Sequence, residues 1–272
     1  MPELPEVETV RRGLSRLYLG CRLTSLSVTG RRTVRRHPPE LLAQLQGQIL
    51  SSVGRHGKYL FLEWSGGQVL VVHLRMSGQL LAARPRDPLA PHTHAVLRFD
   101  RAGELRFVDP RTFGELFVSA SPQPPPVELE DLGPDALGAS PGLFRSALAG
   151  RRAPLKAVLV DQRVLAGVGN IYADEICFAA RLRPDRPAGG VRPHELRRLS
   201  ESARSVLEAA IAAGGSTLRD ERYRDVLGEA GQYQLEHKVY GRAGEPCAKC
   251  GAPVVRVRIG AKSAYFCPRC QS

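Results

Sequence analysis

The chain begins with the stretch Met1-Pro2-Glu3-Leu4-Pro5-Glu6-Val7-Glu8-Thr9-Val10-Arg11-Arg12. An initiator methionine in front of a small residue is normally removed, so we expect the mature chain to start with the secondary amine of Pro2. Such an amine can attack a carbonyl carbon and form an iminium without any other cofactor. Glu3 and Glu6 lie close enough in sequence to move protons around that amine. The alternative is an ordinary N-terminus without a chemical role, and only the rest of the chain can decide between the two.

The residues that follow predict a helix over positions 5–18. Val7, Val10, Leu14 and Leu17 recur at steps of three and four residues, which gives one apolar stripe. We expect this stripe to hold the helix against a domain face and to keep Pro2 from fraying.

From about residue 20 to residue 120 the pattern changes to short strands separated by turns that contain Gly or Pro. The predicted strands are Leu23–Val28, Tyr59–Trp64, Gln68–His73, Ala95–Phe99, Glu104–Val108 and Gly114–Val118. Many short strands with local connections favour an antiparallel β-sandwich or barrel. Together with the helical pattern further on, this predicts an α+β protein.

The remaining sequence predicts three further parts. Residues 121–140 are rich in proline and are typical of a linker or hinge. Residues 141–232 read as a helical domain, and residues 233–272 as a cysteine-containing module. The predicted helices are Leu143–Leu148, Pro154–Asp161, Asn170–Phe178 and His194–Ala213. The N-terminal domain would then span residues 1–120.

Composition limits the class of protein. The 272 residues carry a net charge of +12 and are 43% hydrophobic, which indicates a globular protein that attracts a polyanion, nucleic acid first. The alternative is a basic protein without such a partner. The longest apolar runs, such as 69–72, are far too short to span a membrane. We see no signal peptide and expect a cytoplasmic location.

Four of the six cysteines form the pattern Cys247-x2-Cys250-x16-Cys267-x2-Cys270. Two such pairs can supply four thiolates to one tetrahedral ion, so we predict a single structural Zn²⁺ with no open coordination position. A redox-active dithiol pair is the alternative. The two outlying cysteines, at positions 21 and 177, read as small buried apolar residues. Between the knuckles the sequence predicts a basic β-hairpin that carries Lys262.

Three further groups of residues are candidates for ligand binding. Gly167-Val168-Gly169-Asn170 leads into a helix, whose first amides suit a phosphate, and Lys156 lies on the preceding helix. Lys58 follows a glycine in a turn, where a solvated lysine is the alternative interpretation. His73–Gly78 and Asp109–Gly114 place Met, Arg and Phe at turn tips, where such side chains can enter a base stack; a core position is the alternative for the Met and the Phe.

In this order and spacing, the segments resemble bacterial formamidopyrimidine-DNA glycosylases from end to end. The resemblance implies a β-sandwich that carries the N-terminal helix, and a helical domain with a helix–two-turn–helix motif and a zinc finger. It also implies a monomeric base excision repair enzyme with no small-molecule cofactor. Its partner would be double-stranded DNA that contains oxidised purines or abasic sites, and the enzyme would act at the bacterial nucleoid. The activities implied are excision of 8-oxoguanine and formamidopyrimidines, followed by strand cleavage.

The resemblance also implies roles for individual residues. Pro2 would be the nucleophile that forms the Schiff base, with Glu3 and Lys58 as further catalytic residues. DNA would be bound by His73, Met76, Arg111, Phe113, Lys156, Asn170 and Lys262, and the loop at about 217–232 would cover the flipped base. Lys262 would also be a possible proton donor in the elimination, and the four cysteines would bind zinc.

Two positions depart from the family pattern. Lys262 stands where the family usually has an arginine, five residues before the third zinc cysteine, and Thr112 stands where a second basic residue is expected. Lysine keeps the charge but loses the bidentate fork, so we expect weaker or more salt-sensitive DNA binding. Two rivals stay open: a sister enzyme that excises oxidised pyrimidines, and a DNA-binding protein without catalytic activity.

Overall fold

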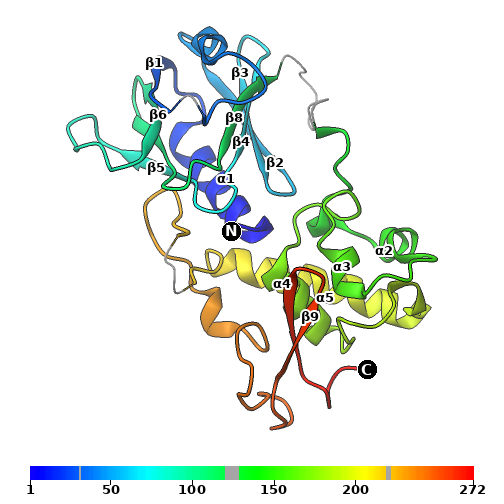
Figure 1. The fold of residues 1–272 in the computed structure, drawn as a ribbon. Helices are drawn as coiled ribbons and strands as arrows, with labels where there is room; N and C mark the ends of the chain where they lie inside the picture. The colour runs from blue at the N-terminus through cyan, green and yellow to red at the C-terminus, as the bar shows by residue number, and fades with distance from the viewer. Residues whose placement is uncertain (31, 120–128, 219–221) are drawn as a thin grey trace. The chain divides into compact units, whose positions relative to one another are not determined.

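The computed structural model describes residues 1–272 apart from residue 31, residues 120–128 and residues 219–221. The described chain forms two compact units. Figure 1 colours the ribbon by residue number, so each segment named below can be found by its colour. The first unit consists of Met1–Glu130 and Ala213–Gln232, and the second of Asp131–Ala212 and Tyr233–Ser272. We expected residues 213–232 in the helical domain, whereas their contacts place them in the first unit. Residues 121–128 of the expected linker, 121–140, lie outside the described residues, and the other expected boundaries stay predictions.

The predicted N-terminal helix is confirmed as α1, Leu4–Tyr18. Val7, Val10 and Leu14 are fully buried, and Leu17 is partly buried. Each fully buried aliphatic side chain contributes roughly 1.5–3 kcal/mol relative to an exposed one. The stripe therefore fixes the helix, and with it the residues in front of it, to the core of the first unit.

Two four-stranded antiparallel sheets build the rest of the first unit, as predicted. One has the order β1 (Leu23–Val28), β6 (Thr93–Phe99), β7 (Gly103–Val108), β5 (Gln79–Ala83), and the other β2 (Leu50–His56), β3 (Tyr59–Trp64), β4 (Val69–His73), β8 (Glu115–Ser119). A 3-10 helix, η1, spans Pro39–Leu45. Trp64 of one sheet stacks on Phe99 of the other with ring centroids 6.2 Å apart, and Tyr18 of α1 packs 4.6 Å from Phe99. The two sheets and α1 therefore share one core.

The second unit is mainly helical and ends in a hairpin. Its helices are α2 (Pro141–Leu148), α3 (Leu155–Leu159), α4 (Asn170–Ala179) and α5 (Pro193–Ala212), with short 3-10 turns at Ala136–Gly138, Ala188–Gly190 and Tyr233–Glu236. Strands β9 (Val255–Ile259) and β10 (Lys262–Phe266) form the predicted hairpin. Among the described residues, no helix combines the length and the apolar composition that crossing a membrane requires.

Candidate active site and nucleic-acid interface

The N-terminal residues are held in place by a capping box at the start of α1. Glu3 is the N-cap, and its backbone N–H donates to Glu6 Oε2 at 2.8 Å. Glu6 Oε1 accepts a second bond, 2.7 Å long, from Ser216 N in the segment that returns to this unit. Pro2 and Glu3 are both buried. The carboxylate of Glu6 therefore ties Glu3, the residue next to Pro2, to Ser216.

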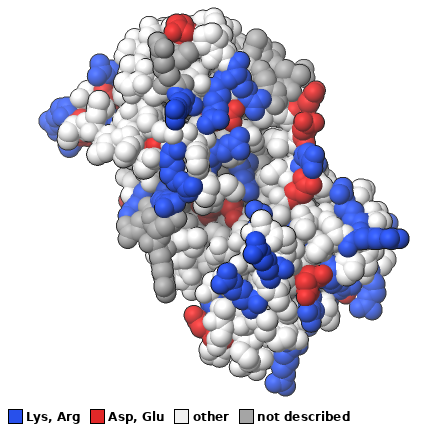
Figure 2. All heavy atoms as spheres, in the orientation of Figure 1, with Lys and Arg blue, Asp and Glu red and all other residues white. Residues whose placement is uncertain are grey.

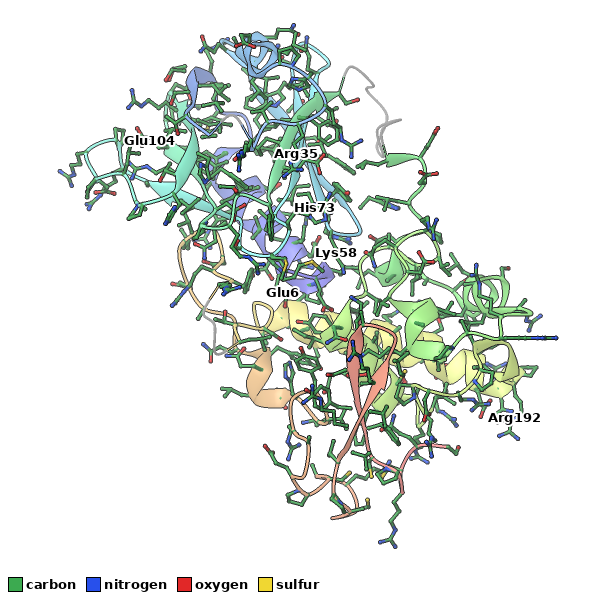
Figure 3. All side chains as sticks on the ribbon, viewed as in Figure 1. Glu6, Arg35, Lys58, His73, Glu104 and Arg192 are labelled. Carbon is green, nitrogen blue, oxygen red and sulfur yellow. The ribbon has the colours of Figure 1, made fainter. Side chains whose placement is uncertain are left out.

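Lys58 comes from a turn and His73 from a strand end of the same sheet, and Figure 3 labels both with Glu6. Lys58 lies in the turn between β2 and β3 and is only 5% exposed, so the solvated-lysine alternative is wrong. His73 pairs with Tyr59 at the end of β4. The rings of these two residues lie 4.3 Å apart.

The histidine has a defined tautomer. His73 Nδ1 accepts a 2.8 Å bond from Arg75 N, which leaves Nε2 to carry the proton in the neutral ring. Burial, helped by the charges of Arg75 and Lys58, lowers the pKa of His73 well below its usual value. His73 is therefore a neutral Nε2–H donor at neutral pH.

Met76, Arg111 and Phe113 lie on two loops that one buried carboxylate joins. Asp109 is fully buried and accepts bonds from Ser77 Oγ at 2.5 Å, Arg111 N at 3.2 Å and Gly114 N at 2.6 Å. The loop after β4 and the loop after β7 are thereby held together.

The apolar tips of these loops are accessible. Met76 is 39% and Phe113 45% exposed, so the core interpretation is wrong for both. The Arg111 guanidinium lies 4.7 Å from the centre of the Phe113 ring. A basic group next to two exposed apolar side chains suits insertion into DNA.

In the second unit, Asn170 starts α4 directly after two glycines, as predicted. Gly167 has φ 109°, a conformation that glycine adopts without strain. Its N–H donates to Gln162 Oε1 at 3.0 Å. The Asn170 amide nitrogen lies 3.5 Å from the hydroxyl of Tyr240. The first turn of α4 thus offers a side-chain amide and a hydroxyl beside a helix N-terminus.

Lys156 is not at the surface. Its side chain is 1% exposed, and Nζ donates to Asp174 Oδ2 at 2.8 Å and to the Ser263 carbonyl oxygen at 2.5 Å. Burial raises the pKa of Asp174 to about 7, whereas the Lys156 ammonium and the Tyr265 N–H act in the opposite direction. The predicted role of Lys156 as a phosphate ligand stays untested, and its ammonium is engaged inside the protein.

The four zinc cysteines meet at one point. The sulfur atoms lie within 4.8 Å of one another, with Cys250 to Cys267 at 3.5 Å and Cys247 to Cys270 at 4.0 Å. Zn–S bonds of about 2.3 Å in a tetrahedron place the sulfurs roughly 3.8 Å apart, so the donor set fits one structural zinc. The outlying Cys21 and Cys177 are buried, as predicted.

The hairpin between the knuckles presents a basic surface. Arg256, Arg258 and Lys262 are exposed and line an open hollow of about 380 Å³. Figure 2 shows Lys and Arg side chains over this hairpin and, separately, over the visible face of the first unit. This distribution suits contact with a polyanion.

Sequence reasoning missed the groups that position these side chains. Glu175 is buried and its carboxylate accepts from the backbone N–H groups of residues 238–240 at 2.8–3.0 Å. Glu6 alone had a local signal, because it is the third residue of a helix that starts at Leu4. For Asp109, Asp174, Glu175 and Tyr240, no sequence pattern shows the distant partner.

Three family models match the chain in order. They are the formamidopyrimidine-DNA glycosylase N-terminal domain over residues 1–116, its H2TH domain over 132–222, and a zinc finger found in FPG and IleRS over 244–272. The formamidopyrimidine-DNA glycosylase of Moorella thermoacetica is 46% identical over 95% of both chains. That of Salinispora arenicola is 44% identical over all of this chain and 96% of its own.

Solved structures agree with this relationship and with the predicted fold. A MutM (Fpg) protein from Thermus thermophilus superposes with a TM-score of 0.87 at 43% identity, covering 99% of this chain and 98% of that one. The Fpg of Lactococcus lactis in complex with DNA containing an abasic site has a TM-score of 0.91 at 34% identity, covering 99% of both chains. Models, relatives and structures all span the chain from end to end. The chain therefore belongs to the formamidopyrimidine-DNA glycosylase family.

Proposed function

We propose that the protein is a bifunctional DNA glycosylase and abasic-site lyase that removes oxidised purines in base excision repair. The observation that carries this is the buried Pro2–Glu3 pair, held at the start of α1 by the capping box. Relatives over the full length are named formamidopyrimidine-DNA glycosylase. Solved structures of the Lactococcus lactis enzyme contain abasic-site DNA and Fapy-dG DNA, which supports the same substrate class here.

In the proposed reaction, the target nucleotide leaves the base stack, which requires roughly a few kcal/mol. The Pro2 amine, free once Met1 is removed, attacks C1′, and the bond from C1′ to the base breaks as the base takes up a proton. The C1′–O4′ bond then breaks as O4′ takes up a proton, which opens the sugar ring and leaves an iminium between Pro2 and C1′. The iminium makes the C2′ proton acidic, so β- and then δ-elimination release both phosphates. Water then hydrolyses the iminium and restores Pro2.

Other residues of the first unit would assist this step. Glu3 would donate or accept protons at the sugar ring and the base. Lys58 and the Nε2–H of His73 would bind phosphate. Met76 and Phe113, with Arg111, would fill the space that the flipped nucleotide leaves.

The second unit would bind the backbone. Asn170 and Lys262 would donate to phosphates, and Lys262 would also be a proton donor in the elimination. Zinc, held by the four cysteines, would fix the hairpin that presents Lys262, and its filled shell leaves no position for substrate.

Borohydride trapping tests the proposal. Reduction of a mixture with 8-oxoguanine DNA is expected to give a covalent adduct at Pro2. The adduct should be lost in Pro2→Gly and in a form with extra residues before Pro2, and kept in the matched control Pro5→Gly. Absence of an adduct with the unmodified protein would point to a DNA-binding protein without catalysis. Faster excision of thymine glycol than of 8-oxoguanine would point to the pyrimidine enzyme.

We also propose that the protein works as a monomer on chromosomal DNA in a bacterial cytoplasm. The matched relatives are bacterial, and a four-thiolate site suits a reducing compartment. Sedimentation with and without duplex DNA tests the first point, and a stable dimer in either sample would contradict it.

A further inference from the structure

The buried contacts of Lys156 are unusual for a lysine expected at a DNA surface. Its ammonium is 1% exposed and the Asp174 carboxylate is fully buried. The two come from α3 and α4. Ion pairs at this depth need hydrogen bonds to their remaining donors and acceptors, because both charges have left water.

The further bonds of the pair go to one strand, and both involve Lys156 Nζ or Asp174 Oδ2; Asp174 Oδ1 has no hydrogen-bond partner among the described residues. Lys156 Nζ donates to the Ser263 carbonyl at 2.5 Å, and Asp174 Oδ2 accepts from Tyr265 N at 3.0 Å. Ser263 and Tyr265 are two residues apart in β10, so their backbone groups point to the same side of the strand. Strand β10 pairs only with β9 among the described strands. The ion pair therefore occupies the free edge of β10, with one donor and one acceptor, as a neighbouring strand would.

This arrangement fixes strand β10 immediately beside Lys262, a residue that is predicted to bind DNA. Lys262 is exposed and precedes Ser263 in β10. An isolated two-stranded hairpin is marginal in water, so the backbone at Lys262 needs support from outside β9. The Lys156–Asp174 pair supplies that support one residue away.

We propose that Lys156 and Asp174 are positioning residues, which hold β10 so that Lys262 can bind phosphate, and that Lys156 itself does not contact DNA. The inference rests on the proposed DNA-repair function only through the role of Lys262. It replaces the direct phosphate contact expected for Lys156 with an indirect action through the hairpin.

A thermodynamic cycle separates the two roles, because residues that act through one another are not additive. The pair variant Lys156→Met/Asp174→Leu removes both charges together, which avoids leaving one of them buried and unpaired. It is compared with Lys262→Met and with the triple variant. Affinity for a duplex containing tetrahydrofuran in place of the abasic sugar is measured by fluorescence anisotropy between 50 and 200 mM salt, concentrations of the order at which phosphate contacts dominate.

We expect the pair variant to bind at least about five-fold more weakly than the unmodified protein. The triple variant should bind within about two-fold of Lys262→Met, with the same salt dependence. If Lys156 contacts DNA directly, the triple variant should instead bind more weakly than Lys262→Met by the same factor by which the pair variant is weaker than the unmodified protein. Its slope of log K against log salt should also be smaller by a further ~0.9. That result, or a pair variant that binds as tightly as the unmodified protein, would overturn the proposal.

Folding is controlled in the same samples. Zinc content and melting temperature are measured for every variant, and Lys238→Met, which removes an exposed pair with Glu236, should change neither. If the pair variant loses zinc, Lys156→Met, which removes the ammonium and leaves Asp174 to accept from Tyr265 N, takes its place in the cycle under the same criteria. Borohydride trapping with the unmodified protein is run alongside, so failure of the catalytic proposal is seen independently of the binding cycle.

Discussion

Single buried carboxylates determine where the functional side chains lie. Asp109 illustrates this, because its carboxylate accepts from three donors and so joins the loops that carry Met76 and Phe113. These three donors bond to the carboxylate oxygens of Asp109, and a buried N–H that is left without an acceptor costs about 1–3 kcal/mol. The geometry of the two exposed tips thus depends on a side chain that solvent does not reach.

We therefore predict that Asp109→Asn destabilises the protein by about 2 kcal/mol and slows base excision. Asparagine keeps one acceptor oxygen and turns an N–H₂ group toward donors that need an acceptor. Chemical unfolding and single-turnover excision measure the two effects. Asp100→Asn is the matched control, since Asp100 is exposed and accepts a single backbone bond from Arg22. Equal stability of the two variants would contradict the argument.

A second prediction concerns Thr112, one of the two departures from the family pattern. Its φ of 54° is unfavourable for a β-branched residue, so an unbranched side chain fits this backbone better. Thr112→Arg should not destabilise the protein. It should tighten lesion-DNA binding by about ten-fold, because a hydrogen bond to a charged group contributes roughly 1.5 kcal/mol.

Thr112→Gln separates the effect of the added charge from the effect of removing the β-branched side chain, because glutamine is unbranched at Cβ but uncharged. Lys262→Arg, which restores the bidentate fork, should act in the same direction. If anisotropy shows unchanged affinity for both arginine variants, the two departures do not weaken DNA binding.

At the scale of elements, periodicity found most strands and all four longer helices. It missed β2 and β5. Strand β2 reads Leu50-Ser51-Ser52-Val53-Gly54-Arg55-His56, with few β-formers, and is a strand because it pairs with β3 along its length. The burial of Lys156 escaped for a similar reason: its partner Asp174 lies 18 residues away. Local patterns report propensity and amphipathicity, whereas these features depend on distant contacts.

The zinc module gives a prediction at this scale. The two knuckles contribute few buried apolar residues, so their fold depends on the metal. Cys270→Ser should lose the bound zinc and bind lesion DNA at least ten-fold more weakly, because the hairpin with Lys262 loses its anchor. Mass spectrometry measures the zinc content and anisotropy the DNA affinity. The control Cys177→Ala replaces a cysteine outside the cluster and should keep its zinc. Full zinc content in Cys270→Ser would show that Cys270 is not a zinc ligand.

A cluster of aromatic rings in the second unit predicts how stability depends on pH. His237 packs edge-on against Tyr233 and Tyr240 at 5.7 and 5.6 Å, and burial lowers its pKa to about 4. Below pH 6.5 the unfolded chain takes up a proton that the folded ring does not. Stability is therefore lost as the pH falls from 6.5 to 4, by on the order of 3 kcal/mol.

The variant His237→Phe isolates this contribution. Its free energy of unfolding, measured by urea at pH 8 and at pH 4.5, should fall less between the two pH values than that of the unmodified protein. Parallel losses in the two proteins would mean that His237 is charged in the folded state.

For the whole molecule, the sequence predicted the class of partner from net charge, but not which charges would meet it. The described structure distinguishes basic residues that are paired or buried from basic residues that are exposed. Arg11, Arg12 and Arg55 are paired with Glu8, Lys156 is buried, and Lys262 is exposed. The excess of +12 therefore describes attraction at a distance, whereas affinity depends on the few cations that reach phosphates.

This distinction predicts the salt dependence of binding. Two charged residues, Lys58 and Lys262, are proposed to bind phosphate, and each neutralised phosphate contributes about 0.9 to the slope of log K against log salt. The slope should then be about −1.8, and less steep by ~0.9 in Lys262→Met, where one counterion fewer is released. Replacing Arg12, which is paired with Glu8, by Met is the matched control and should leave the slope unchanged. A slope much steeper than about −1.8 would mean that further basic groups bind phosphate, and Arg256 and Arg258 beside Lys262 would be the first to replace.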